Sequence, residues 1–257
     1  MRDLNVTLVQ ADQVWENKAA NFSNYLNLLS GLEQTDLIVL PEMFNTAFSM
    51  NAEELAEEFD LSESIEWLKQ LAKVKNAAVY TSLMIQSNGN FYNRGVFVRS
   101  SGEIEFYDKR KRFAMAGEDT VFSAGNEEVI VDYLGWKINL QVCYDLRFPE
   151  NIRNEMKDGK AKYDLLLYVA NWPERRVTHW KSLLVARAIE NQCYVIGVNR
   201  VGTDGKGLTY SGDSFGISPL GEKIGEIQQF EQKSETINLD VQLLTETREK
   251  LPFLKDR

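Results

Sequence analysis

Three short segments of this 257-residue chain carry side chains that could perform acyl-transfer chemistry. Cys143 ends the apolar run 138–142, and polar residues follow it at once, so its thiol is expected at a strand end beside the N–H groups of a helix start. A helix N-terminus or a nearby cation lowers the pKa of a thiol and favours the nucleophilic thiolate. Glu42 and Lys109 follow two other predicted strands and could supply a carboxylate and an ammonium.

Each of these residues also has an ordinary structural interpretation. Glutamates after a strand are usually exposed loop residues. Lys109 lies in the charged stretch 108–112, and such clusters are usually solvated, although this one could also bind an anionic substrate. Free cysteines usually behave as small buried hydrophobes. Cys193 fits that description because apolar residues continue past it, whereas polarity rises directly after Cys143.

Taken together, the three residue types predict one reaction. A thiolate from Cys143 attacks a carbonyl carbon, and the Glu42 carboxylate takes the thiol proton and returns it to a leaving nitrogen. The Lys109 ammonium and the backbone N–H of Tyr144 stabilise the oxyanion. A cysteine–histidine pair would require His179, the only histidine, for which we favour a capping or packing role.

The elements that must position these residues alternate along the chain. Apolar runs predict strands, and periodic apolar stripes predict helices. The expected strands cover 4–10, 36–40, 77–86, 92–99, 103–107, 128–132, 137–142, 163–170, 193–199, 213–218, 222–226 and 236–240; the expected helices cover 17–32, 62–75, 150–156 and 178–191. With no evident linker, we expect one α/β domain over residues 1–257, in which two mixed sheets pack face to face with helices outside. No G-x-G-x-x-G follows the first strand, which argues against a dinucleotide-binding fold.

Composition excludes several classes of function. The net charge of −9 argues against nucleic-acid binding, which needs a basic face. No apolar run approaches the roughly 20 residues that span a bilayer, and the N-terminus lacks a signal-peptide pattern, so we expect a cytoplasmic protein without membrane association. Two cysteines and a single histidine predict neither a disulfide framework nor a histidine-based metal site.

The three segments, in this order, resemble the motifs of the nitrilase superfamily of carbon–nitrogen hydrolases. The matching segments are Leu-Pro-Glu-Met-Phe at 40–44, Tyr-Asp-Lys-Arg at 107–110 and Val-Cys-Tyr-Asp-Leu-Arg-Phe at 142–148. The resemblance implies an αββα sandwich that forms a homodimer, a Glu42–Lys109–Cys143 catalytic set, and no cofactor or metal. Glu118 aligns with a second catalytic glutamate of the family. Lys111 and Arg112 depart from the family pattern, in which many relatives carry His and Leu.

Within the superfamily the chain is most similar to the omega-amidases, through Ala-Asn-Trp-Pro at 170–173 and the stretch 186–192. That branch implies hydrolysis of a short ω-amide, such as 2-oxoglutaramate, by water through a cysteine thioester. Asn171, Trp172, Phe148 and Arg147 are then expected to line the substrate pocket. The substrate's carboxylate requires a cation, and the sequence does not rank the candidates Arg147, Arg175, Arg176 and Arg200.

Two other functions remain open at this point. The chain could be another amidase of the superfamily, acting on deaminated glutathione or an N-carbamoyl amino acid. It could also be a catalytically silent binding or assembly protein on the same fold, although the presence of all three catalytic residue types argues against that.

Overall fold

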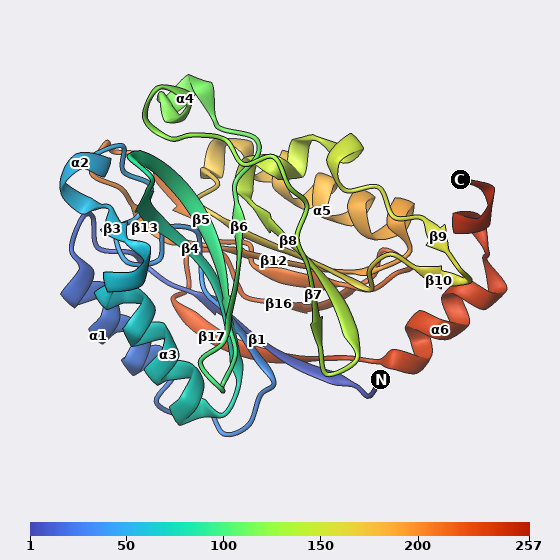
Figure 1. Cartoon of the computed structure of the whole chain (residues 1–257). Coiled ribbons are helices and arrows are strands. Elements are labelled where there is room, and N and C mark those ends of the chain that lie inside the picture. The colour runs from blue at the N-terminus through green and yellow to red at the C-terminus, as the bar shows by residue number, and fades with distance from the viewer.

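Two β-sheets packed face to face form the centre of the molecule in the computed structural model, which describes all residues from 1 to 257 (Figure 1). The first sheet has the order β17-β1-β2-β4-β5-β6, with β3 beside β4, and the second has the order β16-β15-β12-β11-β8-β7. The strands of the first sheet are β1 (Leu4–Gln10), β2 (Leu37–Val39), β3 (Glu57–Glu58), β4 (Ala78–Ser87), β5 (Asn90–Val98), β6 (Ile104–Asp108) and β17 (Lys233–Leu239). Those of the second are β7 (Ile130–Tyr133), β8 (Trp136–Val142), β11 (Leu165–Ala170), β12 (Tyr194–Asn199), β15 (Phe215–Ile217) and β16 (Lys223–Glu226).

Strand direction brings several chain segments to one edge of this sandwich. In the first sheet β2 and β4 are parallel, β5 is antiparallel to β4, and β6 is antiparallel to β5. β2 and β6 therefore run the same way and end at the same edge. In the second sheet β8, β11 and β12 are parallel. Such carboxyl edges of parallel strands are common ligand-binding positions in α/β proteins.

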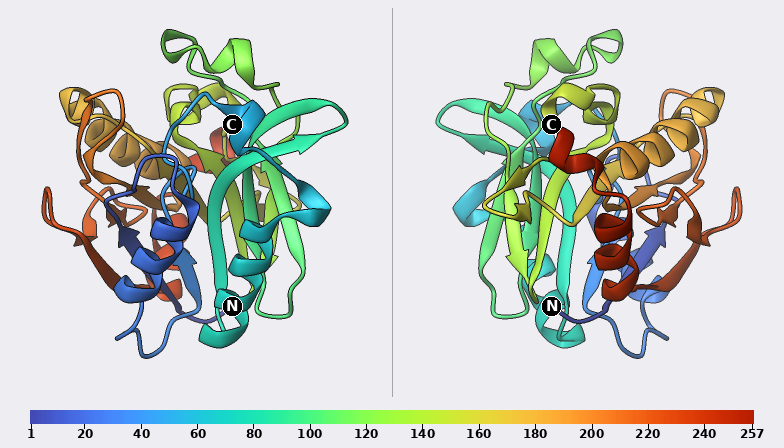
Figure 2. Two further views of the ribbon diagram at one scale, coloured as in Figure 1. Left: turned by 90° about the vertical axis from the view of Figure 1, so that its left-hand side faces the viewer. Right: turned by 90° about the vertical axis from the view of Figure 1, so that its right-hand side faces the viewer.

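Helices cover the outer faces of both sheets. α1 (Lys18–Leu28) and α3 (Glu63–Lys75) lie side by side and bury a shared apolar cluster against the first sheet (Figure 1 and Figure 2). α5 (Val177–Asn191) packs Trp180 and Leu184 against Gly197 of the second sheet. The remaining helices are α2 (Ala52–Leu55), α4 (Glu118–Val121) and α6 (Val241–Lys250), and α4 projects above one edge of the sandwich in every view (Figure 2). None of the helices is both long and apolar enough to cross a bilayer.

One apolar core of 39 buried residues includes side chains from both sheets and from α5 and α6. A polar contact also joins the sheets, since the hydroxyl of Tyr80 on β4 donates to the carbonyl of Gln141 on β8 at 3.0 Å. Local signals define the helix ends as well: the side chain of Ser62 caps α3 by accepting from the N–H of Ile65, and Asn76 ends the helix in the left-handed conformation. The expected α/β sandwich of two sheets and outer helices is confirmed.

The sequence-based prediction of a helix over 150–156 is wrong. The chain makes only a 3₁₀ turn at Pro149–Asn151, and a small hairpin follows, formed by β9 (Met156–Lys157) and β10 (Lys160–Ala161). The buried side chain of Asn154 explains the difference, because it bonds the backbone of Tyr163 and Asn191 rather than allowing a helical turn. The hairpin β13 (Val201–Thr203) and β14 (Thr209–Ser211), and helix α6, lie where no element was expected.

Candidate active site

Glu42 lies three residues beyond β2, directly after Pro41, and its side chain is fully buried at 0% exposure. Its Oε1 accepts hydrogen bonds from Lys109 Nζ and from Asn93 Nδ2, both at 2.8 Å. Its Oε2 accepts from the backbone N–H of Asn171 at 2.9 Å. This carboxylate is therefore not the exposed loop residue that its sequence context also allowed, and each of its oxygens has a fixed donor.

Lys109 follows β6 and contacts two buried carboxylates. Its Nζ donates to Glu42 Oε1 at 2.8 Å and to the two oxygens of Glu118 at 2.8 and 2.9 Å. Burial lowers the pKa of Lys109, but the charges of Glu118 and Glu42 outweigh this effect and hold the pKa well above its ordinary value. Lys109 is therefore a cation at neutral pH, and because it is only 1% exposed it does not belong to a solvated basic surface.

Glu118 is the first residue of α4 and is as deeply buried as Glu42. It accepts from the same ammonium as Glu42, and Asn93 Nδ2 bridges the two glutamates through contacts of 2.8 Å to Glu42 and 3.0 Å to Glu118. Asn93 was not predicted as a site residue. The sequence feature that could have indicated it is the polar pair Asn93–Arg94 within a largely apolar strand.

Cys143 follows β8 directly, and its backbone has a φ of +45°, a left-handed conformation that is unusual for a residue with a side chain. Strain of this kind clusters at functional positions, because the surrounding structure must hold it in place. Cys143 is 9% exposed, and the charges of Glu42 and Lys109 act on its thiol in opposite directions. Tyr144, the next residue, is the second residue of the 3₁₀ turn Cys143–Arg147. Its backbone N–H has no acceptor within the turn, because the first N–H groups of a helix lack intrahelical partners.

The expected lowering of the cysteine pKa is not found. Burial, together with the negative charge of Glu42, raises the pKa of Cys143 well above its ordinary value, and the opposing effect of Lys109 is smaller. The resting side chain is therefore a neutral thiol. A nucleophile in this state needs an adjacent base to remove its proton, and Glu42 is the carboxylate whose charge acts most strongly on the thiol.

Asp145 joins the cysteine segment to the lysine segment. Its Oδ2 accepts from the N–H of Val142 at 3.0 Å and from the hydroxyl of Tyr107 at 2.9 Å, while its Oδ1 accepts from the N–H of Lys111 at 3.0 Å. Burial raises the pKa of Asp145 to about 6. These bonds hold the ends of β6 and β8 at a fixed separation, and with them Lys109 and Cys143.

Lys111 and Arg112, the two residues of the lysine loop that depart from the expected motif, both contact neighbouring segments. Lys111 places its ammonium over the ring of Phe148, 4.6 Å from the centroid. Arg112 Nη1 donates to the carbonyls of Asp119 and Phe122 at 3.2 and 3.0 Å, which fastens the loop to α4. Neither of these contacts involves Lys109 or its two glutamates.

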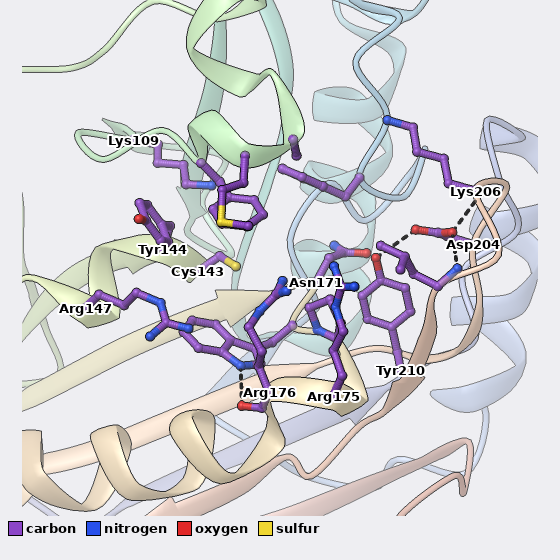
Figure 3. Close-up of a pocket in the computed structure, with 17 residues that line it drawn as sticks. Lys109, Cys143, Tyr144, Arg147, Asn171, Arg175, Arg176, Asp204, Lys206 and Tyr210 are labelled. Atoms are coloured by element: carbon purple, nitrogen blue, oxygen red, sulfur yellow. Dashed lines mark hydrogen bonds between the residues drawn. The ribbon is translucent and has the colours of Figure 1, made fainter.

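A cavity of about 300 Å³ opens above the thiol (Figure 3). Of the four residues expected to line the substrate pocket, Asn171, Trp172 and Arg147 do so, together with Phe48. Phe148 is outside the lining, because it packs edge-on behind Tyr144 with ring centroids 5.2 Å apart. The far wall comes from the turn before α5, with the two candidate arginines Arg175 and Arg176, and from the β13–β14 hairpin, which the sequence did not indicate. The lining residues of the hairpin are Asp204, Lys206, Leu208 and Tyr210.

His179 lies outside the cavity lining, on the first turn of α5. Its Nδ1 is 3.2 Å from Arg147 Nη2, so the ring accepts a hydrogen bond from the guanidinium. This contact agrees with the structural role favoured for His179. The structure also contains no group of three or more histidine, cysteine or acidic side chains that could hold a metal ion.

Comparisons with known proteins agree with this geometry. The model of the carbon–nitrogen hydrolase family matches residues 5–249. The omega-amidase YafV of Escherichia coli strain K12 is 43% identical over 256 residues, which cover 100% of this chain and 97% of that protein. The 2-oxoglutaramate amidase of Bacillus subtilis is 35% identical, with 87% and 85% covered. The crystal structure of XC1258 from Xanthomonas campestris, a CN-hydrolase superfamily protein with an arsenic adduct in its active site, superimposes with a TM-score of 0.97 at 40% identity, covering 100% of this chain and 98% of that one.

Proposed function

Because this chain belongs to the carbon–nitrogen hydrolase family, we propose that it hydrolyses the ω-amide of a short 2-oxo dicarboxylate, such as 2-oxoglutaramate, to the acid and ammonia. The family and its omega-amidase relatives identify the chain as an amidase. The observation that supports the assignment of residues is the buried pair of Glu42 and Lys109, 2.8 Å apart, whose charges act in opposite directions on the pKa of the Cys143 thiol.

In the first half of the reaction Glu42 removes the proton of Cys143 while Sγ attacks the amide carbon. The carbonyl oxygen becomes an oxyanion, which the N–H of Tyr144 and Lys109 Nζ bind. Lys109 has three N–H donors; when the two oxygens of Glu118 share one and Glu42 takes another, the third is free to face the cavity. Collapse of the tetrahedral intermediate breaks the C–N bond, and Glu42 returns its proton to the leaving nitrogen, so ammonia departs and a thioester remains.

In the second half water takes the place of ammonia. Glu42 removes a proton from that water, which attacks the thioester carbon, and the proton is returned to Sγ when the C–S bond breaks. The sum is amide plus water to acid plus ammonia, with the enzyme unchanged. Glu118 acts by holding Lys109 and, through Asn93, the Oε1 side of Glu42, so that the base keeps its orientation through both proton transfers.

Ammonia release from a panel of substrates tests the proposal. The panel contains 2-oxoglutaramate, an N-carbamoyl amino acid and deaminated glutathione, and we expect 2-oxoglutaramate to have the highest kcat/KM. Cys143→Ala should abolish turnover, whereas Cys193→Ala, which changes the fully buried second cysteine, should retain it. A preference for the carbamoyl compound would reject the omega-amidase assignment, and full activity of Cys143→Ala would reject the mechanism.

We also propose that two copies form a homodimer through their helical layers, as the family resemblance implies. We further propose that the enzyme works in the cytoplasm, as expected from the sequence. The dimer is supported by two exposed apolar side chains near the end of α5, Ile189 at 52% and Leu220 at 43% exposure. They belong to one surface region, because a Cβ at Gly221 would lie 2.7 Å from Ile189 Cδ1. Light scattering during size-exclusion chromatography should give twice the chain mass, and a monomer mass at working concentration would contradict this.

A further inference from the structure

The outer part of the cavity carries more cations than the protein itself neutralises. Of the charged side chains in the lining, Lys109 is paired with Glu42 and Glu118. Three arginines and one lysine remain, with Asp204 as the only carboxylate beside them. Both oxygens of Asp204 are committed to its own hairpin, where they accept from the N–H groups of Lys206 and Leu208 and from the hydroxyl of Tyr210. In a chain with a net charge of −9, this local excess of positive charge marks the end of the cavity that suits an anion.

The structure ranks the arginines that could bind such an anion. Arg200 is fully buried outside the lining, where its guanidinium bonds Asp12 and the carbonyls of Gln13 and Val201. Arg147 donates to His179 and stacks on Trp172 at 4.6 Å, so it already has partners. Arg175 is exposed to solvent.

Arg176 differs from the other three. It lines the cavity and is half-buried, yet its guanidinium makes no hydrogen bond or ion pair with any group of the protein. The guanidinium lies over the ring of Phe113, 5.2 Å from its centroid. Burial is the largest of the effects that lower the pKa of Arg176. An arginine held in this way, partly desolvated and without a counter-ion, gains more from binding a carboxylate than a solvated one does.

The backbone of Arg176 is fixed relative to the reacting groups. Its carbonyl accepts from Trp172 Nε1 at 2.8 Å, and its N–H donates to the carbonyl of Pro173 at 2.9 Å. The neighbouring Asn171 N–H holds Glu42. The guanidinium extends from this turn into the cavity, toward Asn171 and the thiol of Cys143 (Figure 3).

We propose that the guanidinium of Arg176 binds the carboxylate at the far end of the ω-amide and thereby selects anionic amides over neutral ones. The inference rests on the proposed function and identifies its specificity-determining residue. Two parallel N–H···O bonds would fix the carboxylate while the amide carbon lies at Sγ. Arg176 acts on substrate binding and orientation, and it takes no part in the proton transfers assigned to Glu42.

A matched pair of substrates separates charge recognition from catalysis. Glutaramate carries the distal carboxylate, and valeramide has the same five-carbon chain without it. Replacing Arg176 with glutamine should lower kcat/KM for glutaramate about 10- to 100-fold, the effect expected for a hydrogen bond to a charged group. Valeramide hydrolysis should change less than about threefold, because it loses no charge-assisted contact. Arg153→Gln is the control: it removes an exposed arginine that lies outside the cavity lining, and it should leave both substrates unaffected.

A binding measurement gives a second readout that needs no turnover. In a Cys143→Ala background, calorimetry with glutarate should show an affinity about 10- to 100-fold weaker when Arg176 is glutamine, and Arg176→Lys should recover part of that loss because it keeps the charge without the fork. Equal losses for both substrates, an unchanged glutarate affinity, or an equal loss in Arg153→Gln would overturn the assignment of Arg176. Failure of the wild-type enzyme to hydrolyse either glutaramate or 2-oxoglutaramate would instead reject the proposed function.

Discussion

Replacing Lys109 with methionine removes the only cation that contacts the buried carboxylates of Glu42 and Glu118. Methionine has a similar length and adds no polar group, so the change isolates the loss of charge. The two carboxylates, both 0% exposed, would remain close together with Asn93 as their shared donor. We expect the variant to be inactive and, more informatively, much less stable than the wild type.

The size of the effect follows from the geometry. At the observed 2.8 Å each contact to the ammonium has a gross attraction of about 6 kcal/mol at an effective dielectric constant of about 20. Desolvation of the three groups offsets most of this attraction. Breaking such a buried pair by removing one partner costs about 3–5 kcal/mol, because the remaining charge stays buried without compensation. Adding Glu118→Gln to Lys109→Met should recover about 1–3 kcal/mol, the usual coupling between residues in contact.

Urea unfolding at neutral pH measures these differences. The chain contains five tryptophans, so intrinsic fluorescence can follow the transition, at one fixed protein concentration because subunit association would shift the midpoint. The control is Lys250→Met. Its ammonium also pairs with a glutamate, Glu246 at 2.7 Å, but the two side chains are 72% and 41% exposed, and the unfolding free energy should not change measurably.

Two results would refute this reasoning. A Lys109→Met variant within about 1 kcal/mol of the wild type would mean that the carboxylates are not charged and buried as described. A double variant with Glu118→Gln that is no more stable than Lys109→Met alone would mean that the two glutamates do not share the ammonium.

Two further predictions concern the supports of the site. A Cβ at Gly125 would lie 2.1 Å from the carbonyl oxygen of Asp108, next to Lys109, so Gly125→Ala should shift the end of β6 and lower kcat roughly 10- to 100-fold. A Cβ at Gly31 would have no atom within 4 Å, so the control Gly31→Ala should leave kcat unchanged. Equal activity of the two variants would contradict the argument. Burial raises the pKa of Asp145 from its ordinary value of 3.8 to about 6 in the folded state, so the native state holds a proton that the unfolded state releases. The unfolding free energy should therefore fall as pH rises from about 4 to about 6, by about 3 kcal/mol from this group. Asp145→Asn should remove that part of the slope in urea titrations at several pH values, and an unchanged slope would show that Asp145 does not titrate there.

Much of the scaffold could be predicted from the sequence, because apolar strands and amphipathic helices have strong local periodicity. The strand ends near Pro41 and at Val142 could also be predicted, because a proline stops strand pairing and polar residues follow Cys143. These strand ends located Glu42 and Cys143. The β13–β14 hairpin was not predictable, since its strands are three residues each and depend on neighbours distant in sequence. The helix expected over 150–156 failed because a single buried asparagine bonds the backbone of distant segments, an effect that local propensity does not contain.

The site shows the same division. Residue types and motif order indicated Glu42, Lys109 and Cys143. The sequence could not show that Asn93, on β5, donates to both Glu42 and Glu118. The direction of the cysteine pKa was also out of reach, because it depends on whether burial and Glu42 outweigh Lys109. The ranking of four arginines required knowing which guanidinium lacks a partner in the folded chain.

The β13–β14 hairpin has a consequence for how this enzyme could diversify. Glu42, Lys109 and Cys143 stand at the ends of hydrogen-bonded strands, whereas Asp204, Lys206, Leu208 and Tyr210 at the far wall come from this short hairpin. The proposed catalytic residues and this part of the cavity wall thus come from different segments of the chain, although Asn171 both lines the cavity and bonds Glu42. Exchanging residues 201–211 between homologues is a route to new amide substrates in which the thioester chemistry is inherited intact.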